Sequence, residues 1–220
     1  MKFNIITIFP EIFKSYFDES IIKRAKDKKA VKIKIYNLRD FTTDKHKTVD
    51  DTVYGGGAGM LMKIEPLYKA IKKIASKPKT KNQKIILLSA KGKKWDQTMA
   101  QKYSQLKDIT LICGRYEGVD DRIKHFIDEE ISIGDYVITG GELGAMIIVD
   151  SLTRLLPNVL GNAESLKDES HNQTGILEYP QYTKPAIFKV GSKKYSVPEV
   201  LTSGNHSLIQ KWKEKLAKKG

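Results

Sequence analysis

Runs of apolar residues, separated by segments with apolar residues at helical spacing, define the beginning of the chain. Phe3 to Phe9 is a nearly continuous apolar run that predicts a buried strand, and Pro10-Glu11 opens a helix. A second helix is expected near Ser20 to Lys28. Val31 to Tyr36 alternates apolar residues with lysine, which predicts a strand with one face in solvent. The first part of the chain therefore alternates strand and helix.

The same alternation continues to about residue 156. Buried strands are expected at Lys84 to Leu88 and at Ile109 to Cys113. The predicted helices are Ile64 to Ala75, Trp95 to Tyr103, Val119 to Phe126 and Leu143 to Leu156. Strands that alternate with helices are typical of an α/β fold, so the pattern predicts an open, mainly parallel sheet.

Two stretches interrupt this pattern. Leu38 to Leu61 is polar, glycine-rich and without a period, and a loop of that length in a compact domain is usually functional or disordered. Pro157 to about Pro185 is rich in Asn, Ser, Glu and Gly, as in a linker or lid. We expect an α/β domain over 1–160, a flexible linker or lid over 161–180, and a short helical C-terminal piece over 181–220.

Composition indicates a globular chain in a reducing compartment. The 220 residues are 40% hydrophobic and 30% charged, which leaves enough apolar side chain for a core. Cys113 is the single cysteine, so no internal disulfide is possible. The apolar run Phe3 to Phe9 is too short to span a membrane or to form a signal core. The expected location is the cytoplasm, with no membrane partner.

The net charge of +13 is concentrated in patches. Ile21 to Lys34 holds seven basic residues and one acid, and Lys72 to Lys94 holds nine lysines and no acid. Such patches attract a polyanion such as nucleic acid. The alternative is a coding bias, because 34 of the 39 basic residues are lysine.

The first polar loop combines charges of both signs, a histidine and a run of glycines. It contains Arg39-Asp40-Phe41, His46, Val49-Asp50-Asp51 and Tyr54-Gly55-Gly56-Gly57. It has neither the spacing of a Walker loop nor a G-x-G-x-x-G pattern after a strand, so a nucleotide-phosphate cradle is not expected. Its carboxylates stand beside lysines, which favours loop salt bridges over metal ligation, and we predict no metal site.

Three further polar, glycine-bearing segments lie at or near strand ends. They are Leu88 to Gly92, Cys113 to Asp120 and Ser132 to Leu143. In open α/β sheets ligands bind at the carboxyl ends of strands, so the first two are expected to be walls of one pocket. The last mixes backbone donors with apolar side chains, which suits a flat purine ring.

One arginine and two acidic residues are the remaining candidate site residues. Arg154 is the only basic residue between Lys124 and Lys167, in an apolar stretch where a buried guanidinium needs a carboxylate or an anion. The sequence leaves two interpretations of Arg154 open, an internal ion pair and an anion-binding site. Asp168 and Glu169 lie in the polar segment that follows and by themselves would pass as solvated charges.

These motifs, in this order, resemble the bacterial tRNA (guanine-N1-)methyltransferase family. The resemblance runs from Ile5 through Ser203-Gly204-Asn205-His206 and includes Cys113 to Gly118 and Ile133 to Val137. It implies a SPOUT-class α/β fold with a deep trefoil knot, S-adenosyl-L-methionine as methyl donor, and a homodimer whose active site uses both subunits. The implied substrate is tRNA, held by its anticodon stem-loop and methylated at the guanine just 3′ of the anticodon, position 37. The resemblance also implies that the short C-terminal piece over 181–220 contacts the tRNA.

The resemblance also assigns site residues. Contact with the methyl donor is implied for Leu88, Ser89, Gly114, Tyr116, Glu117, Ile133, Gly134, Asp135, Tyr136, Val137, Ile138, Gly140 and Gly141. Contact with the tRNA is implied for His46, Asp50, Tyr54 and Ser170. Magnesium during turnover is implied as well, without a set of ligands to locate it.

The chemistry requires a base and a cation. Guanine N1 must lose a proton as the methyl group arrives, so a carboxylate is needed near N1 and a cation near O6. Arg154 matches the family's arginine in the second role. The family's catalytic aspartate, which precedes a serine, aligns with Glu169, while Asp168 lies one residue early. Either carboxylate can be the base, and Glu169 is favoured.

Two rival functions stay open. One is a ribose 2′-O-methyltransferase of the same knotted class, which would not require guanine. The other is a tRNA-binding protein without turnover, which the departure at Glu169 would favour. The chain also ends soon after Trp212, where family members continue through a further basic helical segment, so it is either a naturally short member or a shortened chain.

Overall fold

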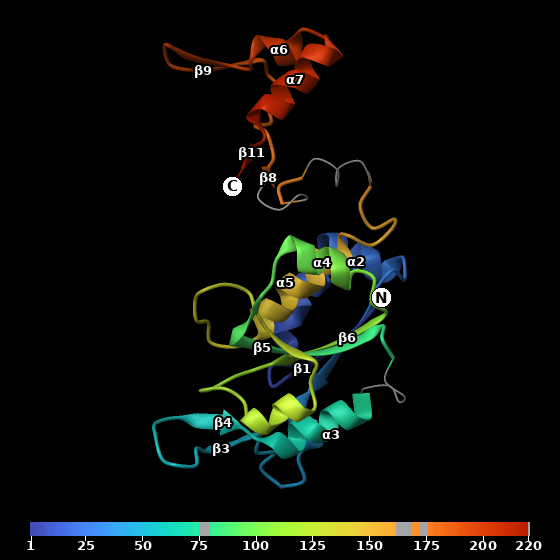
Figure 1. Ribbon diagram of the computed structural model, residues 1–220, viewed down its shortest axis with the longest axis vertical. Helices are drawn as coiled ribbons and strands as arrows, with labels where there is room; N and C mark the ends of the chain where they lie inside the picture. The colour runs from blue at the N-terminus through green and yellow to red at the C-terminus, as the bar shows by residue number, and fades with distance from the viewer. Residues whose placement is uncertain (75–79, 162–168, 172–175, 220) are drawn as a thin grey trace. The chain divides into compact units, whose positions relative to one another are not determined.

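The computed structural model describes residues 1–74, 80–161, 169–171 and 176–219. The chain divides into two compact units, Met1–Gly161 and Asn162–Gly220, which we describe separately (Figure 1). Asp168, one of the two candidate bases, lies outside the described residues. In the described ranges no helix is long and apolar enough to cross a membrane.

A parallel sheet forms the centre of the first unit. Its strands are β1 (Lys2–Thr7), β2 (Lys32–Asn37), β5 (Gln83–Lys94), β6 (Asp108–Cys113) and β7 (Glu129–Ser132). The order is β2-β1-β6-β5-β7 and every pairing is parallel. Phe3 of β1 pairs with Ile33 on one side and Ile109 on the other. The predicted α/β class with a mainly parallel sheet is confirmed.

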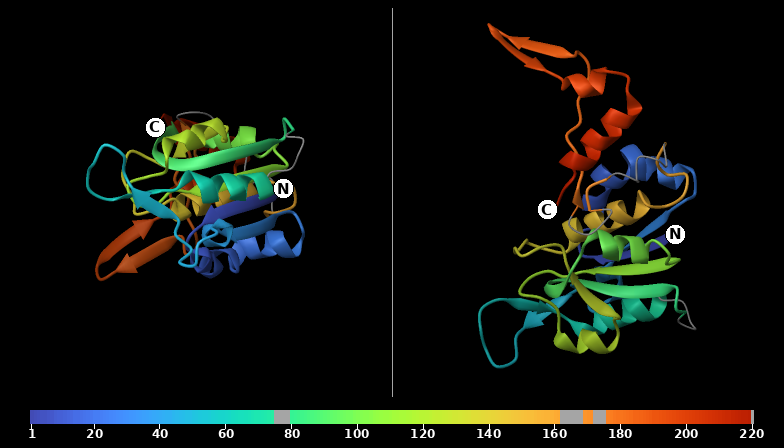
Figure 2. Two further views of the ribbon diagram at one scale, coloured as in Figure 1. Left: turned by 90° about the horizontal axis from the view of Figure 1, so that it is seen from below. Right: turned by 45° about the horizontal axis from the view of Figure 1, so that its top comes forward.

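Helices cover both faces of this sheet (Figures 1 and 2). They are η1 (Pro10–Phe13), α1 (Lys14–Phe17), α2 (Ser20–Asp27), η2 (Leu38–Phe41), α3 (Ile64–Ile74), α4 (Gln97–Tyr103), η3 (Asp121–His125) and α5 (Glu142–Thr153). One core cluster joins α1, α2, α4 and α5 to the sheet through Phe3 and Leu111. The other joins α3, η2 and η3 to it through Ile6 and Ile112. Each fully buried apolar side chain of this size contributes about 1.5–3 kcal/mol.

Three expectations from the sequence need correction. The stretch Leu38 to Leu61 is not structureless, because it holds η2 and a small antiparallel pair, β3 (Asp50–Thr52) with β4 (Met60–Met62). Strand β5 continues to Lys94, and its register with β7 breaks between Leu88 and Lys93. The helix expected at Val119 to Phe126 is the short 3-10 helix η3.

The second unit contains short strands and two helices. Its elements are β8 (Ile176–Leu177), β9 (Ile187–Val190), β10 (Lys193–Ser196), α6 (Glu199–Thr202), α7 (His206–Leu216) and β11 (Lys218–Lys219). The predicted helical piece is present as α6 and α7, and the Asn205 side chain caps α7 by accepting from the Leu208 amide at 3.2 Å. The antiparallel hairpin β9–β10, which turns at Gly191 with φ +59°, was not predicted.

Candidate functional site

The carboxyl ends of β5, β6 and β7 meet at one edge of the sheet. Leu88, where the register of β5 with β7 breaks, pairs with Cys113 at the end of β6 and with Ile131 near the end of β7. Gly114 and Ile133 follow β6 and β7 directly. A Cβ atom on Gly114 would lie 3.1 Å from the carbonyl oxygen of Leu88, tighter than an ordinary contact. Two of the three glycine-bearing segments therefore touch directly, and their role as walls of one pocket stays a prediction.

The segment before α5 packs into these strand ends. The Gly141 amide donates to the Gly114 carbonyl at 2.9 Å. A Cβ atom on Gly141 would lie 2.8 Å from Cys113 Cα and 3.0 Å from Leu88 Cβ. Glycine is needed here because the backbones approach too closely for any side chain.

An exposed apolar loop borders the same edge. Tyr136, Val137 and Ile138 are 55%, 87% and 36% exposed. Gly134 has φ +157° and lies against the Tyr136 ring, so a Cβ atom there would be 2.4 Å from the ring. Asp135 forms an ion pair with Lys94 of β5, which ties the loop to the strand. The loop therefore exposes apolar side chains, and contact of these side chains with a flat ring stays a prediction.

Tyr116 connects the third segment to the first polar loop. It adopts the left-handed conformation, φ +60°, which is costly for a bulky side chain. Burial, together with the charge of Asp50 and a hydrogen bond to it, raises the pKa of Tyr116, and Arg39 opposes that rise. The Asp50 loop therefore meets the strand-end segment at Tyr116.

The same loop is tied to the backbone beside Tyr116. The Glu117 amide donates to the Met60 carbonyl at 3.1 Å, and the Met62 amide donates to the Gly118 carbonyl at 3.0 Å. A Cβ atom on Gly59 would lie 2.4 Å from Glu117 Cγ. The structure thus brings a loop about 60 residues earlier in the sequence to the strand ends.

The remaining loop residues point into solvent. His46 and Glu117 are exposed, and Tyr54 is 99% exposed. Ser89 is half-buried, and its hydroxyl accepts from the Lys91 amide at 3.2 Å. These side chains are available to a ligand.

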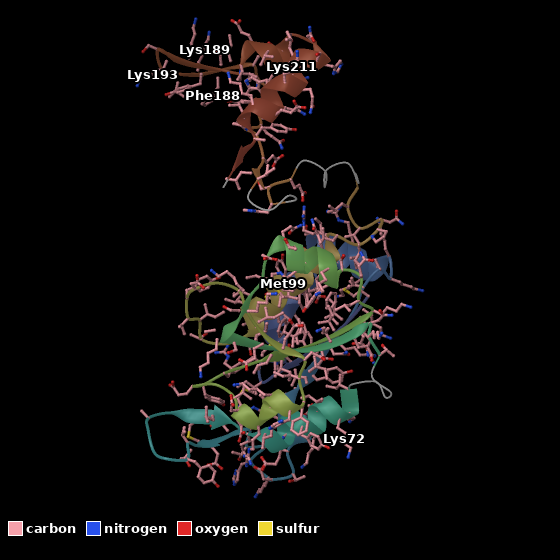
Figure 3. The ribbon with its side chains drawn as sticks, in the orientation of Figure 1. Lys72, Met99, Phe188, Lys189, Lys193 and Lys211 are labelled. Carbon is pink, nitrogen blue, oxygen red and sulfur yellow. The ribbon has the colours of Figure 1, made fainter. Side chains whose placement is uncertain are left out.

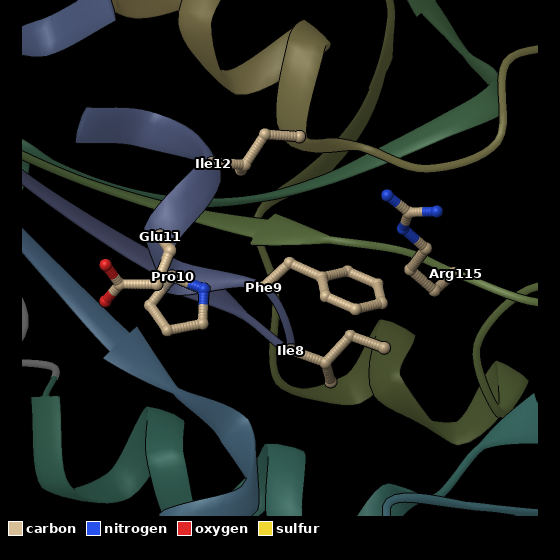
Figure 4. A pocket seen from close by; sticks show the side chains of 6 residues that line it. All are labelled: Ile8, Phe9, Pro10, Glu11, Ile12 and Arg115. Atoms are coloured by element: carbon tan, nitrogen blue, oxygen red, sulfur yellow. The ribbon is translucent and has the colours of Figure 1, made fainter. Parts of the chain in front are cut away.

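A buried ion pair beside the strand ends was missed in the sequence. Glu142 is 1% exposed and accepts from the Thr7 hydroxyl at 2.8 Å and from Arg115 Nε at 3.1 Å. The Arg115 guanidinium also lies 4.7 Å from the centre of the Phe9 ring, as Figure 4 shows. In the sequence, Glu142 stands out only as an acid at the start of an apolar helix. Its partners, Thr7 and Arg115, come from distant segments.

Phe9 and Arg115 line an open hollow of about 500 Å³. Its other lining residues are Ile8, Pro10, Glu11 and Ile12 (Figure 4). The lining is mostly apolar, and it comes from the link between β1 and η1, from the start of η1, and from Arg115 after β6.

Arg154 lies directly after α5 and is half-buried. Its spacing along the helix places it on the face that carries Leu143, Ile147 and Asp150. Leu143 and Ile147 are 54% and 43% exposed, and Asp150 accepts a hydrogen bond from Tyr16. Arg154 therefore ends an exposed, largely apolar stripe.

The candidate base lies in the second unit. Glu169 is half-buried there, and Ser170 accepts from the Glu178 amide at 2.9 Å through its hydroxyl. Arg154 belongs to the first unit. Elsewhere, the described residues contain no group of three His, Cys, Asp or Glu side chains close enough to hold a metal ion.

This geometry defines the class of protein: a parallel α/β domain whose glycine-bearing segments meet at one edge of its sheet, the edge at which open α/β sheets bind ligands. The family model described as tRNA (Guanine-1)-methyltransferase TrmD matches residues 1–220, so the chain belongs to that family. This confirms the family and the methyltransferase class predicted from the motifs. The family implies S-adenosylmethionine as methyl donor and tRNA as substrate.

Curated relatives agree with the family model. The chain is 55% identical over 219 residues to a protein of Dictyoglomus turgidum named tRNA (guanine-N(1)-)-methyltransferase, covering 100% of this chain and 86% of the relative. Proteins of the same name from Clostridioides difficile and Enterococcus faecalis are 52% and 48% identical over 214 and 215 residues. Those matches cover 97% and 98% of this chain and 90% and 85% of the relatives.

Proposed function

We propose that this protein transfers a methyl group from S-adenosyl-L-methionine to N1 of the guanine immediately 3′ of the anticodon, position 37, in tRNA. The observation that carries the proposal is the strand-end site, where Gly114 and Gly141 leave no room for side chains, in a chain of this family. The tRNA substrate supports the predicted cytoplasmic location.

The strand-end residues fit the methyl donor. Leu88 and Gly114 form the floor, and the exposed loop of Tyr136, Val137 and Ile138 offers apolar surface to the adenine ring. Gly140 and Gly141 are the predicted donor contacts beside this loop, and Gly141 packs against Cys113 and Leu88. The donor supplies a methyl group on a positively charged sulfur. The remaining predicted contacts are Ser89, Glu117, Ile133, Gly134 and Asp135.

Tyr116 is held for contact with the methyl donor by residues of another loop. Its backbone is in the left-handed conformation directly after β6, and Asp50 and Arg39 are close enough to shift the pKa of its hydroxyl in opposite directions. Since strain of this kind persists only where surrounding contacts enforce it, we assign the Asp50 loop a part in shaping the site. His46 and Tyr54 of the same loop are exposed toward a large substrate such as tRNA.

We assign proton removal to Glu169 and charge stabilisation to Arg154. Glu169 accepts the N1 proton, and the Arg154 guanidinium stabilises the negative charge that develops on O6. Asp168 is the alternative base, and Ser170 an adjacent contact to the tRNA. Among the described residues no group of three His, Cys, Asp or Glu side chains marks a place for the Mg²⁺ that the family resemblance implies.

The exposed stripe on α5 supports a homodimer. Leu143 and Ile147 present apolar surface on the helix face that ends at Arg154, and the neighbouring Ile12 and Tyr16 are 39% and 42% exposed. Burial of this stripe by a second copy would remove apolar surface from water and place Arg154 at the interface. An active site built from both subunits follows naturally from that position.

The knot of the family is also part of the proposal. The segment between Leu88 and Lys93 lies against β7, since a Cβ atom on Gly92 would be 2.4 Å from the Ile131 nitrogen. The start of α5 is fixed between strand ends by Glu142 and Gly141. Close crossing of these segments supports a trefoil arrangement.

The test is methyl transfer to an unmodified tRNA transcript with guanine 3′ of the anticodon, beside the same transcript with adenine there. Nucleoside mass spectrometry should detect 1-methylguanosine with the first transcript and none with the second. A 2′-O-methylated nucleoside with both would favour the ribose methyltransferase. Binding of tRNA and methyl donor without product would favour a binding protein.

Two variants assign the chemistry. Arg154→Ala should lower kcat by orders of magnitude while methyl donor binding is retained, because the guanidinium acts on charge present only in the transition state. Glu169→Gln should do the same, with Asp168→Asn as its matched control. Loss in Asp168→Asn and not in Glu169→Gln would transfer the role of base.

A further inference from the structure

A buried ion pair that the proposed reaction does not use joins two segments with predicted methyl donor contacts. Arg115 lies directly before Tyr116, and Glu142 directly after Gly141. Arg115 Nε donates to Glu142 Oε2 at 3.1 Å, so the pair connects the turn after β6 with the start of α5. Glu142 is 1% exposed, and a carboxylate so deeply buried is costly unless it is paired.

The pair is also fixed to the end of β1. The Thr7 hydroxyl donates to Glu142 Oε1 at 2.8 Å and accepts from the Phe9 amide at 2.9 Å. The Arg115 guanidinium lies 4.7 Å from the centre of the Phe9 ring (Figure 4). Each charged group therefore has two partners, and together they hold three segments that are far apart in the sequence.

The pair lies directly against the backbone of Gly140. A Cβ atom on Gly140 would be 2.6 Å from Arg115 Cδ and 2.6 Å from Glu142 Oε2. The next residue, Gly141, donates its amide to the Gly114 carbonyl at 2.9 Å. The ion pair and this backbone hydrogen bond thus join the same two segments at adjacent positions.

Arg115 also anchors the strained residue that follows it. Tyr116 has φ +60°, and strain of this kind persists only where surrounding contacts enforce it. The Arg115 amide donates to Met62 Sδ at 3.2 Å, and its carbonyl accepts from the Gly118 amide at 3.1 Å. Because Glu142 holds the side chain as well, a turn that relaxed the strain at Tyr116 would have to displace one of these contacts.

We propose that Arg115 and Glu142 are positioning residues of the methyl donor site, which hold Tyr116 and Gly141 in the arrangement that binds S-adenosylmethionine. The pair acts through these two segments and takes no part in the transfer itself. Without the pair, the segments occupy the binding arrangement for only part of the time, and the apparent Kd for the donor rises in proportion. The inference rests on the proposed donor site and adds residues outside its predicted contacts.

The test uses a variant that separates positioning from stability. Arg115→Met, Glu142→Gln removes both charges and keeps an oxygen that accepts from Thr7, so no buried carboxylate is left unpaired. Its Kd for S-adenosylmethionine in calorimetric titration should still rise roughly tenfold, as for a binding arrangement populated about one tenth of the time. Glu142→Gln alone, a milder change, should raise the Kd by less.

Steady-state kinetics give a second readout of the double variant. The KM for S-adenosylmethionine should rise with the Kd, while kcat at saturating donor stays near that of the wild type. The reason is that the pair acts on donor binding and not on charge that develops in the transition state.

Two control variants lower stability without touching the pair. Met99→Ala truncates a buried side chain on α4, labelled in Figure 3, and leaves a cavity in the core that α4 shares with the sheet. Lys2→Met breaks an ion pair with Asp108 at 2.9 Å, which joins β1 to β6 at the opposite end from Arg115. Both should bind the donor with the wild-type Kd below their melting temperatures.

The results divide clearly. Wild-type donor affinity in the double variant would refute the positioning role, and so would an equal loss of affinity in Met99→Ala or Lys2→Met. A lower kcat with an unchanged KM would refute it as well. If the donor affinities are as expected but the wild type makes no 1-methylguanosine, the proposed reaction fails and the positioning role stands.

Discussion

Replacing Arg115 by methionine tests the buried ion pair that joins the strand ends to α5. Glu142 is 1% exposed, so loss of its guanidinium partner leaves a carboxylate in the interior. Such losses typically cost about 3–5 kcal/mol. The lower end applies here, because the Arg115 side chain is 20% exposed and the Thr7 hydroxyl still donates to Glu142.

This loss of stability lowers the melting temperature by a measurable amount. A unit of 161 residues has an unfolding entropy of about 0.3 kcal/mol per kelvin, so about 3 kcal/mol lowers its Tm by about 9 °C. Calorimetry of the purified protein gives this shift. The matched control is Arg122→Met, which breaks an exposed ion pair with Asp120 and should cost less than about 1 kcal/mol.

A double-mutant cycle identifies the cause. Glu142→Gln removes the buried charge but keeps an oxygen that accepts from Thr7, so Arg115→Met in that background should cost about 1 kcal/mol. The coupling energy is then about 2 kcal/mol. Additive effects, or a shift for Arg115→Met no larger than that for Arg122→Met, would refute the claim that the guanidinium compensates Glu142.

Three further outcomes are expected. Gly141→Ala should weaken S-adenosylmethionine binding at least roughly tenfold in calorimetric titration, because its Cβ would lie 2.8 Å from Cys113 Cα; wild-type binding would show that the loop can shift. Asp96→Ala removes the cap on the Met99 amide and should cost about 1 kcal/mol in urea unfolding, and no change would mean another group caps α4. The hydrogen bond to Asp150 raises the pKa of Tyr16 to about 12, so its stabilisation is complete below pH 10 and is lost as pH rises toward 12. Tyr16→Phe should therefore flatten the fall in stability over that window, and identical urea-unfolding profiles would contradict this.

The sequence predicted the elements that bury apolar side chains. The apolar runs ending at Leu88 and Cys113 are central strands, and their glycines form the site edge. Strand β7 was missed because it has four residues and begins with two glutamates, so only pairing with β5 marks it. The hairpin β9–β10 buries none of its strand residues and gave no periodic signal, although the two-residue loop at Gly191 could have indicated it.

The site was predictable to a smaller extent. Local sequence shows that Tyr116 follows a strand, but its contacts with Arg39 and Asp50 depend on how a distant loop folds back. The partners of Glu142 come from β1 and from the segment after β6. The roles proposed for Arg154 and Glu169 rest on the family resemblance, because neither residue carries a spacing pattern that defines a base or a cation.

The strand order also has a consequence for synthesis of the protein. Strand β1 leaves the ribosome before its neighbour β6. Asp108 of β6, which pairs with Lys2 of β1, lies 106 residues later in the sequence. At about 5–20 residues per second the strand waits roughly 5–20 s for β6, and α5 follows later still. During this interval a nascent chain carries the apolar residues of β1 with one strand edge unpaired. Long-range parallel pairing is intrinsically slow, so newly made chains should depend on chaperones more than a helical protein of the same length does.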